Sequence, residues 1–168
     1  ANPWAMAHGQ QLEQAYLRAM RNPGHEIRAA RIVYLFDGQT LWYALPSGRV
    51  LCYPNAKFDD EGNVTYTKAA WKPAADAKEW PRARLWRGLA CENVVQATAH
   101  DLLRVACREL DAAGITTLGH VHDEIIVECR AGDAEAVSAE VHRIMCTAPE
   151  WAQGLPLAAE GATTTRYS

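Results

Sequence analysis

The sequence stretch best suited to chemistry is GHVHDEIIVEC, residues 119–129, in which three titratable side chains follow one another. A valine precedes His122, Asp123 and Glu124, and two isoleucines follow them, so apolar strand-forming residues flank a polar step. This pattern predicts a β-hairpin, with strands at 115–121 and 125–130. A polar turn without function would look the same. The alternative is that the turn presents the Asp123 carboxylate to a divalent ion and a phosphate-bearing substrate.

A long helix is predicted before this hairpin, from Leu89 to Ala113, and Gly114 closes it. Its apolar residues define a broad core-facing side. Asn93, Gln96, His100 and Arg104 follow one another at spacings of three, four and four, which places them on one polar stripe. Such a stripe is either a solvated face or a surface for the DNA minor groove, where every base pair offers a hydrogen-bond acceptor.

The elements that must position these residues predict an α+β fold, an antiparallel sheet with packed helices. Asn2 and Pro3 open a first helix, and Asn22-Pro23-Gly24 ends it. Asp37-Gly38 suits a tight turn between two strands. The remaining predicted elements are strands within 27–36, 39–46, 46–54, 64–71 and 79–86, a polar loop at 55–63, a helix at 134–145 capped by Asp133, and a short strand at 157–160.

Composition restricts the class of protein. The chain has 168 residues, 49% of them hydrophobic and 22% charged, as expected for one globular domain. No apolar run approaches the roughly 20 residues of a membrane span, so no membrane partner is expected. Five cysteines without a CxxC pair predict reduced, mostly buried thiols in a cytoplasmic protein. With a net charge of −3, any contact with DNA must be local.

Helix and hairpin together carry a resemblance. ENVVQATAHDLL followed by HVHDEIIVE resembles the C-terminal palm of family A DNA polymerases, the group of bacterial DNA polymerase I and many phage replicases. LWYALPSGRVLCYP, EWPRARLWRGLACEN and TAPEWAQGLPLAAEG look like the neighbouring palm segments. The resemblance implies that residues 1–168 are a single domain, the C-terminal palm portion carrying motif C, with a variable strand and loop segment at 55–88.

The resemblance also implies roles for individual residues. Asp123 would be the metal-coordinating aspartate of motif C, and Glu124 its acidic neighbour near the primer terminus. His122 would hold the terminal sugar-phosphate of the primer, and Gln96 would contact the minor groove. Asn93 would do the same, although the family's asparagine stands four residues before the glutamine, where this chain has Glu92.

Other contacts with DNA would come from basic residues before the long helix. The candidates for binding phosphates are Arg82, Arg84 and Arg87. The complete enzyme would use two Mg²⁺ ions and would bind primer–template DNA and deoxynucleoside triphosphates. With one of the two metal-binding carboxylates, this fragment is expected to hold Mg²⁺ weakly or not at all.

Two family features are missing from the sequence: the motif resembling Asp-Tyr-Ser-x-x-Glu and the fingers helix that grips the triphosphate. Asp37, Asp59, Asp60 and Asp101 lack the required neighbours. Ala1 would therefore lie just beyond the fingers helix, and the chain would be part of a longer or split enzyme. Its partner would be the missing N-terminal polymerase portion, and alone it should be inactive.

Two alternatives belong to other classes. A metal phosphohydrolase of the HD type needs several separated His and Asp ligands on helices, whereas the His-Asp pair here is predicted between strands. A non-catalytic DNA-binding or protein-interaction module, derived from a polymerase, would retain the fold without the chemistry.

Overall fold

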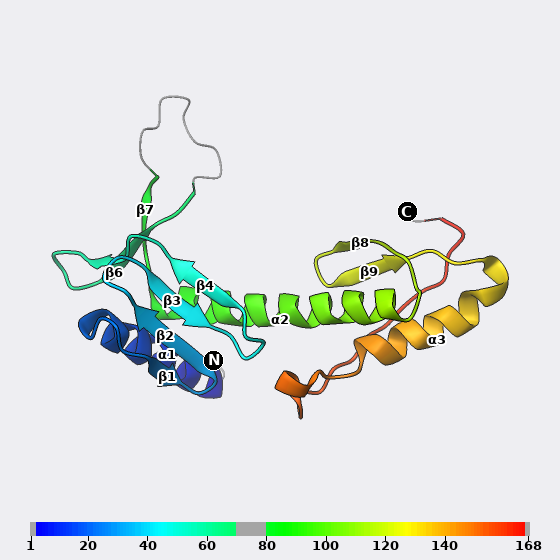
Figure 1. Cartoon of the computed structure of the whole chain (residues 1–168), viewed down its shortest axis with the longest axis horizontal. Helices are drawn as coiled ribbons and strands as arrows, with labels where there is room; N and C mark the ends of the chain where they lie inside the picture. The colour runs from blue at the N-terminus through cyan, green and yellow to red at the C-terminus, as the bar shows by residue number, and fades with distance from the viewer. Residues whose placement is uncertain (1–2, 70–79, 167–168) are drawn as a thin grey trace. The chain divides into compact units, whose positions relative to one another are not determined.

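The structure of the chain is a computed structural model that describes residues 3–69 and 80–166. Its helices and antiparallel sheets confirm the predicted α+β class (Figure 1). The contacts divide the chain into two compact units, residues 1–97 and 98–168. That the whole chain acts as a single domain stays a prediction.

The first unit is built on helix α1 (Pro3–Arg21) and an antiparallel sheet of four strands in the order β1-β2-β3-β4. These strands are β1 (Ile27–Ala29), β2 (Ile32–Phe36), β3 (Leu41–Ala44) and β4 (Val50–Tyr53). Alternate residues of β2 are buried, and the helical spacing of Leu12, Tyr16 and Ala19 places them in the same core. Helix α1 therefore covers one face of this sheet.

Two predictions about this unit were incomplete. The apolar run 27–36 was taken as one strand, but a turn at Ala30 divides it into β1 and β2, which pair with each other. Ala30 has a φ of 51°, a left-handed conformation that is uncommon for alanine, so the residue type does not predict the turn. The polar loop 55–63 contains a short strand, β5 (Lys57–Phe58).

Strand β5 belongs to a second antiparallel sheet, of three strands in the order β5-β6-β7. Its other strands are β6 (Val64–Thr67) and β7 (Arg82–Arg84). Residues 70–79, part of the predicted variable segment 55–88, lie outside the described residues.

Helix α2 (Arg87–Ala112) confirms the predicted long helix and contributes to both units. Ala90 and Val94 lie in the core of the first unit, whereas Ala106 and Leu110 lie in the core of the second. The helix ends at Ala112, one residue before the predicted end, and Gly114, which was predicted to close it, has a φ of 74°. The Ile115 amide donates to the Leu110 carbonyl at 2.9 Å, a 6→1 bond that caps the last turn.

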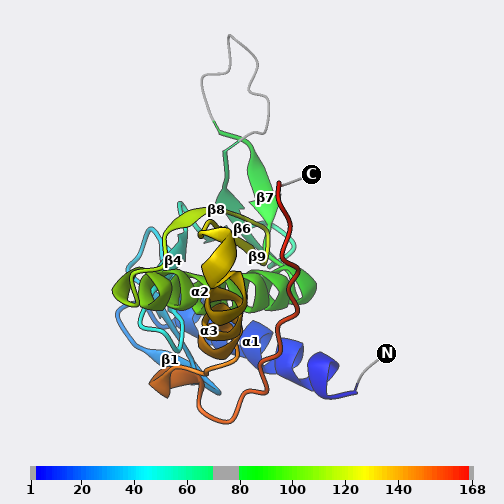
Figure 2. The ribbon, with the colours of Figure 1, turned by 90° about the vertical axis from the view of Figure 1, so that its right-hand side faces the viewer.

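The second unit combines the end of α2 with strands β8 (Thr117–Val121) and β9 (Glu124–Val127) and with helix α3 (Ala134–Met145). Short 3₁₀ turns cover Ala131–Asp133 (η1) and Glu150–Ala152 (η2). In Figures 1 and 2 the β8–β9 hairpin lies on one side of the second part of α2 and α3 on the other. Apolar residues of all three elements form the core of this unit, namely Ala106, Leu110, Ile125, Val127, Val141 and Ile144.

Three further predictions were wrong. Asp133 occupies the N-cap position of α3, but its side chain makes no capping hydrogen bond, because the preceding 3₁₀ turn gives it helical backbone angles. No strand forms at 157–160. The cysteines have free thiols, but Cys52 and Cys129 are exposed and the other three only half-buried.

Within the described residues, no helix combines the length and the apolar character needed to cross a membrane.

Candidate functional site

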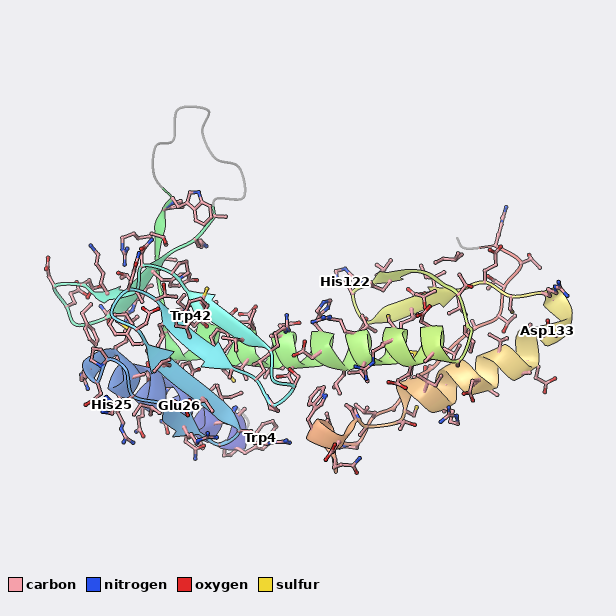
Figure 3. The ribbon with its side chains drawn as sticks, viewed as in Figure 1. Trp4, His25, Glu26, Trp42, His122 and Asp133 are labelled. Atoms are coloured by element: carbon pink, nitrogen blue, oxygen red, sulfur yellow. The ribbon has the colours of Figure 1, made fainter. Side chains whose placement is uncertain are left out.

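The predicted hairpin is confirmed, and its turn consists of His122 and Asp123. Strands β8 and β9 pair antiparallel, with Val121 opposite Glu124 and His120 opposite Ile125. Glu124 is the first residue of β9. The side chains of His122, Asp123 and Glu124 are all exposed, so three polar groups face solvent at and beside the turn, which is found in Figure 3 at the label of His122.

The hairpin forms because its two faces differ. Ile125 and Val127 point to one face of β9 and pack against the end of α2 and against α3. Burial of this face fixes the register, because a slip by one residue would expose both side chains. The core therefore holds the hairpin, and the turn is carried at a defined position.

The turn itself has an unusual backbone. His122 has a φ of 54°, in the left-handed region, which costs a residue with a Cβ roughly 1–2 kcal/mol. A two-residue hairpin turn usually has glycine at a first position with positive φ. Histidine is among the residues that tolerate this region, but glycine would adopt it without strain. The turn chemistry alone does not account for histidine at this position.

Within the described residues, no group of three or more His, Cys, Asp or Glu side chains is arranged to hold a metal ion. Asp123 brings a single exposed carboxylate, and Glu124 follows it in a strand, where successive side chains point to opposite faces. Mg²⁺ commonly takes only one or two carboxylates and completes its coordination with waters and substrate phosphates. The Asp123 carboxylate therefore suits a partial magnesium site.

Of the four other aspartates considered in the sequence, Asp60 is exposed and the other three have contacts or burial within the chain. The Asp37 carboxylate accepts hydrogen bonds from the Thr40 and Gln39 amides and from the Trp42 indole, which hold its pKa below the usual range. Asp59 accepts a hydrogen bond from the Asn63 amide, the main reason that its pKa is also lowered. Asp101 is buried. The Asp37 and Asp59 carboxylates are thus occupied by hydrogen bonds within the chain, and the Asp101 carboxylate lies 3.7 Å from the Arg104 guanidinium.

The members of the polar stripe on α2 differ in their surroundings. Gln96 is exposed, and so are His100 and Arg104. Asn93 is half-buried, and its amide nitrogen donates to the Tyr53 hydroxyl at 2.9 Å. The Asn93 amide is therefore tied to the aromatic core of the first unit, whereas Gln96 can reach a ligand in solvent.

The three candidate arginines also differ. The Arg82 guanidinium donates to the Thr65 carbonyl at 2.8 Å, to the Thr65 hydroxyl at 2.7 Å and to the Asn55 carbonyl at 3.0 Å, so it braces the β5-β6-β7 sheet. Arg87 is half-buried, and a Cβ added at Gly9 would lie 3.0 Å from its Cγ, so its stem packs against α1. Arg84 is exposed. Of the three, Arg84 has the geometry best suited to a phosphate.

A pair of histidines on α2 and β8 was not predicted from the sequence. The rings of His100 on α2 and His120 on β8 are 6.0 Å apart between centroids, in an edge-to-face arrangement. They line a pocket of about 380 Å³ together with Leu103, Arg104 and Cys107. The signal available in the sequence was the alternation of His120 with His122, but only the packing of the hairpin on α2 pairs His120 with His100.

The chain is similar to the DNA polymerase of Bacillus phage SP02, with 35% identity over 136 residues, which make up 81% of this chain and 21% of that protein. The chain thus spans about a fifth of the length of the curated relative that it matches. No family model matches the chain, and no solved structure does.

The similarity supports a relationship to DNA polymerases of phage origin. The aligned part covers a small share of the relative. The similarity therefore does not by itself assign the activity, substrates or partners of the whole relative to this chain.

Proposed function

We propose that this chain is the C-terminal part of the palm of a family A DNA-directed DNA polymerase and carries the motif C hairpin. The observation that carries the proposal is the exposed Asp123 carboxylate at the turn of a core-anchored hairpin, in a chain similar to a phage DNA polymerase. The fold class and the long helix before the hairpin agree with this assignment.

Asp123 would supply one of the carboxylates that hold Mg²⁺ in the complete enzyme. Bound Mg²⁺ would neutralise charge on the attacking and leaving oxygens of nucleotidyl transfer. The exposed His122 imidazole would donate a hydrogen bond to the sugar-phosphate at the primer terminus. Glu124 would lie beside that terminus as the acidic neighbour of Asp123.

Residues outside the hairpin would hold the duplex. The exposed Gln96 amide would donate to purine N3 or pyrimidine O2 in the minor groove, which permits contact without reading sequence. Arg84 would bind a backbone phosphate, with Arg87 as a second candidate. Asn93 would act indirectly, since its amide nitrogen is bonded to Tyr53. Arg82 would mainly stabilise the sheet that carries Arg84.

Catalysis would require a second polypeptide region with the other metal-binding aspartate and the triphosphate grip. We propose that this region is the N-terminal portion of the polymerase, either on the same chain or supplied separately, and that the 168 residues alone do not incorporate nucleotides. The enzyme would act in the cytoplasm on primer–template DNA and deoxynucleoside triphosphates.

The test is primer extension by this chain together with the N-terminal polymerase portion, for which the phage relative is a source. We expect synthesis with the pair, and a loss of at least about a hundredfold in Asp123→Asn, because transfer depends on that carboxylate. Asp133→Asn is the matched control. It makes the same chemical change at an exposed residue of the same unit whose side chain makes no capping hydrogen bond, so activity should persist.

Synthesis that survives Asp123→Asn would contradict the proposed mechanism. Incorporation by the 168 residues alone would contradict the proposed need for a second region. Duplex binding without synthesis in every combination would favour the non-catalytic module instead.

A further inference from the structure

We infer that the pocket between α2 and β8 is a subsite for one nucleotide of a nucleic-acid strand, with the phosphate at Arg104 and the base against the rings of His100 and His120. This inference rests on the proposed function, because it names a further part of the surface that would bind DNA. The pocket lies entirely within the second unit.

The pocket is built from one face of a helix and one strand. His100, Leu103, Arg104 and Cys107 follow one another at spacings of three, one and three, which places them on neighbouring positions of the same face of α2. His120 reaches the pocket from β8, where it lies opposite Ile125. Cross-strand partners share a face of the sheet, and Ile125 packs toward α2, so His120 also faces the helix.

The floor and walls of the pocket are partly apolar. Leu103 is buried, with 9% of its surface exposed. Burial raises the pKa of the Cys107 thiol, which keeps it protonated and uncharged at neutral pH. A neutral thiol is a poor metal ligand, and the described residues contain no group of three potential ligands. The pocket therefore suits an organic ring better than a metal ion.

The rim carries a cation. The Arg104 guanidinium lies 3.7 Å from the Asp101 carboxylate, and 62% of the Arg104 side chain is exposed against 5% for Asp101. The buried carboxylate orients the arginine from below through one nitrogen, and the exposed part of the guanidinium fork can pair with a phosphate. Asp101 also offsets part of the charge, so a simple inorganic anion gains little without the stacking surface.

The base and the phosphate of a nucleotide would thus each have a complementary group in the pocket, the histidine rings and Arg104. Histidine rings commonly stack on unpaired bases, and arginine binds the adjoining phosphate. The pocket is an open depression of about 380 Å³ beside the exposed His100 and His120, so it can hold a single nucleotide without enclosing it. His120 lies in β8, two residues before His122 in the turn, so the subsite adjoins the turn.

The experiment is an NMR titration of the histidine ring signals in the full chain. The probes are deoxyadenosine monophosphate, inorganic phosphate, a single-stranded octanucleotide and a duplex of the same sequence. We expect the His100 and His120 signals to move with the nucleotide and with at least one oligonucleotide, and to move much less with phosphate alone. The His25 and His142 signals should stay in place, since neither residue lines the pocket.

Two arginine variants provide the control. Arg104→Ala should raise the Kd for the nucleotide at least fivefold, because it removes the phosphate contact. Arg108→Ala removes the same charge from the same helix, at an exposed arginine that bonds Glu109 and does not line the pocket, and should change the Kd less than twofold. His120→Gln, which keeps a hydrogen-bonding group but removes the ring, should weaken nucleotide binding and leave phosphate binding unchanged.

The comparison of probes identifies the source of the ligand. A stronger response to the single strand than to the duplex supports an unpaired nucleotide whose base contacts the rings, whereas a stronger response to the duplex would overturn that base contact. Equal effects of Arg104→Ala and Arg108→Ala would overturn the inference. So would silent His100 and His120 signals with every probe, even if primer extension depends on Asp123. Conversely, if primer extension fails while these signals move as expected, the subsite stands and the polymerase assignment does not.

Discussion

Replacing His122 by glycine distinguishes the effect of the turn's backbone conformation on stability from the effect of the histidine side chain. The left-handed φ of 54° costs histidine about 1 kcal/mol, toward the low end of the range because histidine tolerates this region. Glycine relieves that strain but loses about 0.5–1 kcal/mol through its larger backbone entropy in the unfolded state. His122→Gly should therefore leave the hairpin as stable as before, or more stable by up to about 0.5 kcal/mol.

The neighbouring substitution Asp123→Gly supplies the reference. Asp123, unlike His122, does not have a positive φ. Glycine at position 123 therefore adds backbone entropy to the unfolded state without relieving any strain in the folded turn. The free energy of local unfolding should differ between the two variants by about 1 kcal/mol, or about fivefold in the opening constant. Amide hydrogen exchange of β8 and β9 measures this opening directly.

Faster exchange in His122→Gly than in Asp123→Gly would refute the reasoning, because it would mean that the histidine side chain stabilises the turn. Primer extension completes the design. If the imidazole holds the primer, both His122→Gly and His122→Asn should lose activity in the complete enzyme, although both tolerate the left-handed backbone. Full activity in His122→Asn would contradict the role proposed for the ring.

The other predictions concern the first unit. Within the part of the chain that the structure describes, the buried Tyr34 hydroxyl has no hydrogen-bond partner, so Tyr34→Phe should raise the free energy of unfolding by about 1 kcal/mol. Tyr53→Phe should lower it by about 1 kcal/mol, because the Asn93 amide loses its acceptor; urea denaturation measures both. Burial raises the pKa of Tyr16, Tyr34 and Tyr53, so these hydroxyls lose their protons at lower pH in the unfolded chain than in the folded one. The free energy of unfolding should therefore be intact below about pH 10 and fall as the pH rises further, which thermal melts measure. Arg82→Ala should lower stability with little change in the salt dependence of duplex binding, whereas Arg84→Ala should reduce the salt slope by about one with little change in stability.

Local sequence signals were enough to predict the helices and the site hairpin. Helix α3 begins and ends as expected, because its apolar residues recur at the helical period, although the predicted cap by the Asp133 side chain is wrong. The β8–β9 hairpin was predicted because β-branched residues surround a polar pair, and Asp123 stands in the turn for that reason. The α+β class follows from the mixture of these periods.

Features that depend on distant contacts were missed. The break at Ala30 depends on β1 folding back on β2, since alanine carries no turn signal. Arg82 was considered a DNA ligand because its charge is visible in the sequence, whereas its hydrogen bonds to Thr65, 17 residues away, are not.

The composition of the candidate site shows the same division. The sequence by itself determined which groups stand on the hairpin turn and which follow one another along α2, because strand and helix periods relate near neighbours. Only the tertiary structure decided that Asn93 bonds Tyr53 and that His120 meets His100, across 40 and 20 positions of sequence. For His120 the physical reason is that burial of Ile125 and Val127 against α2 sets the position of β8, and no local pattern records which helix face will receive it.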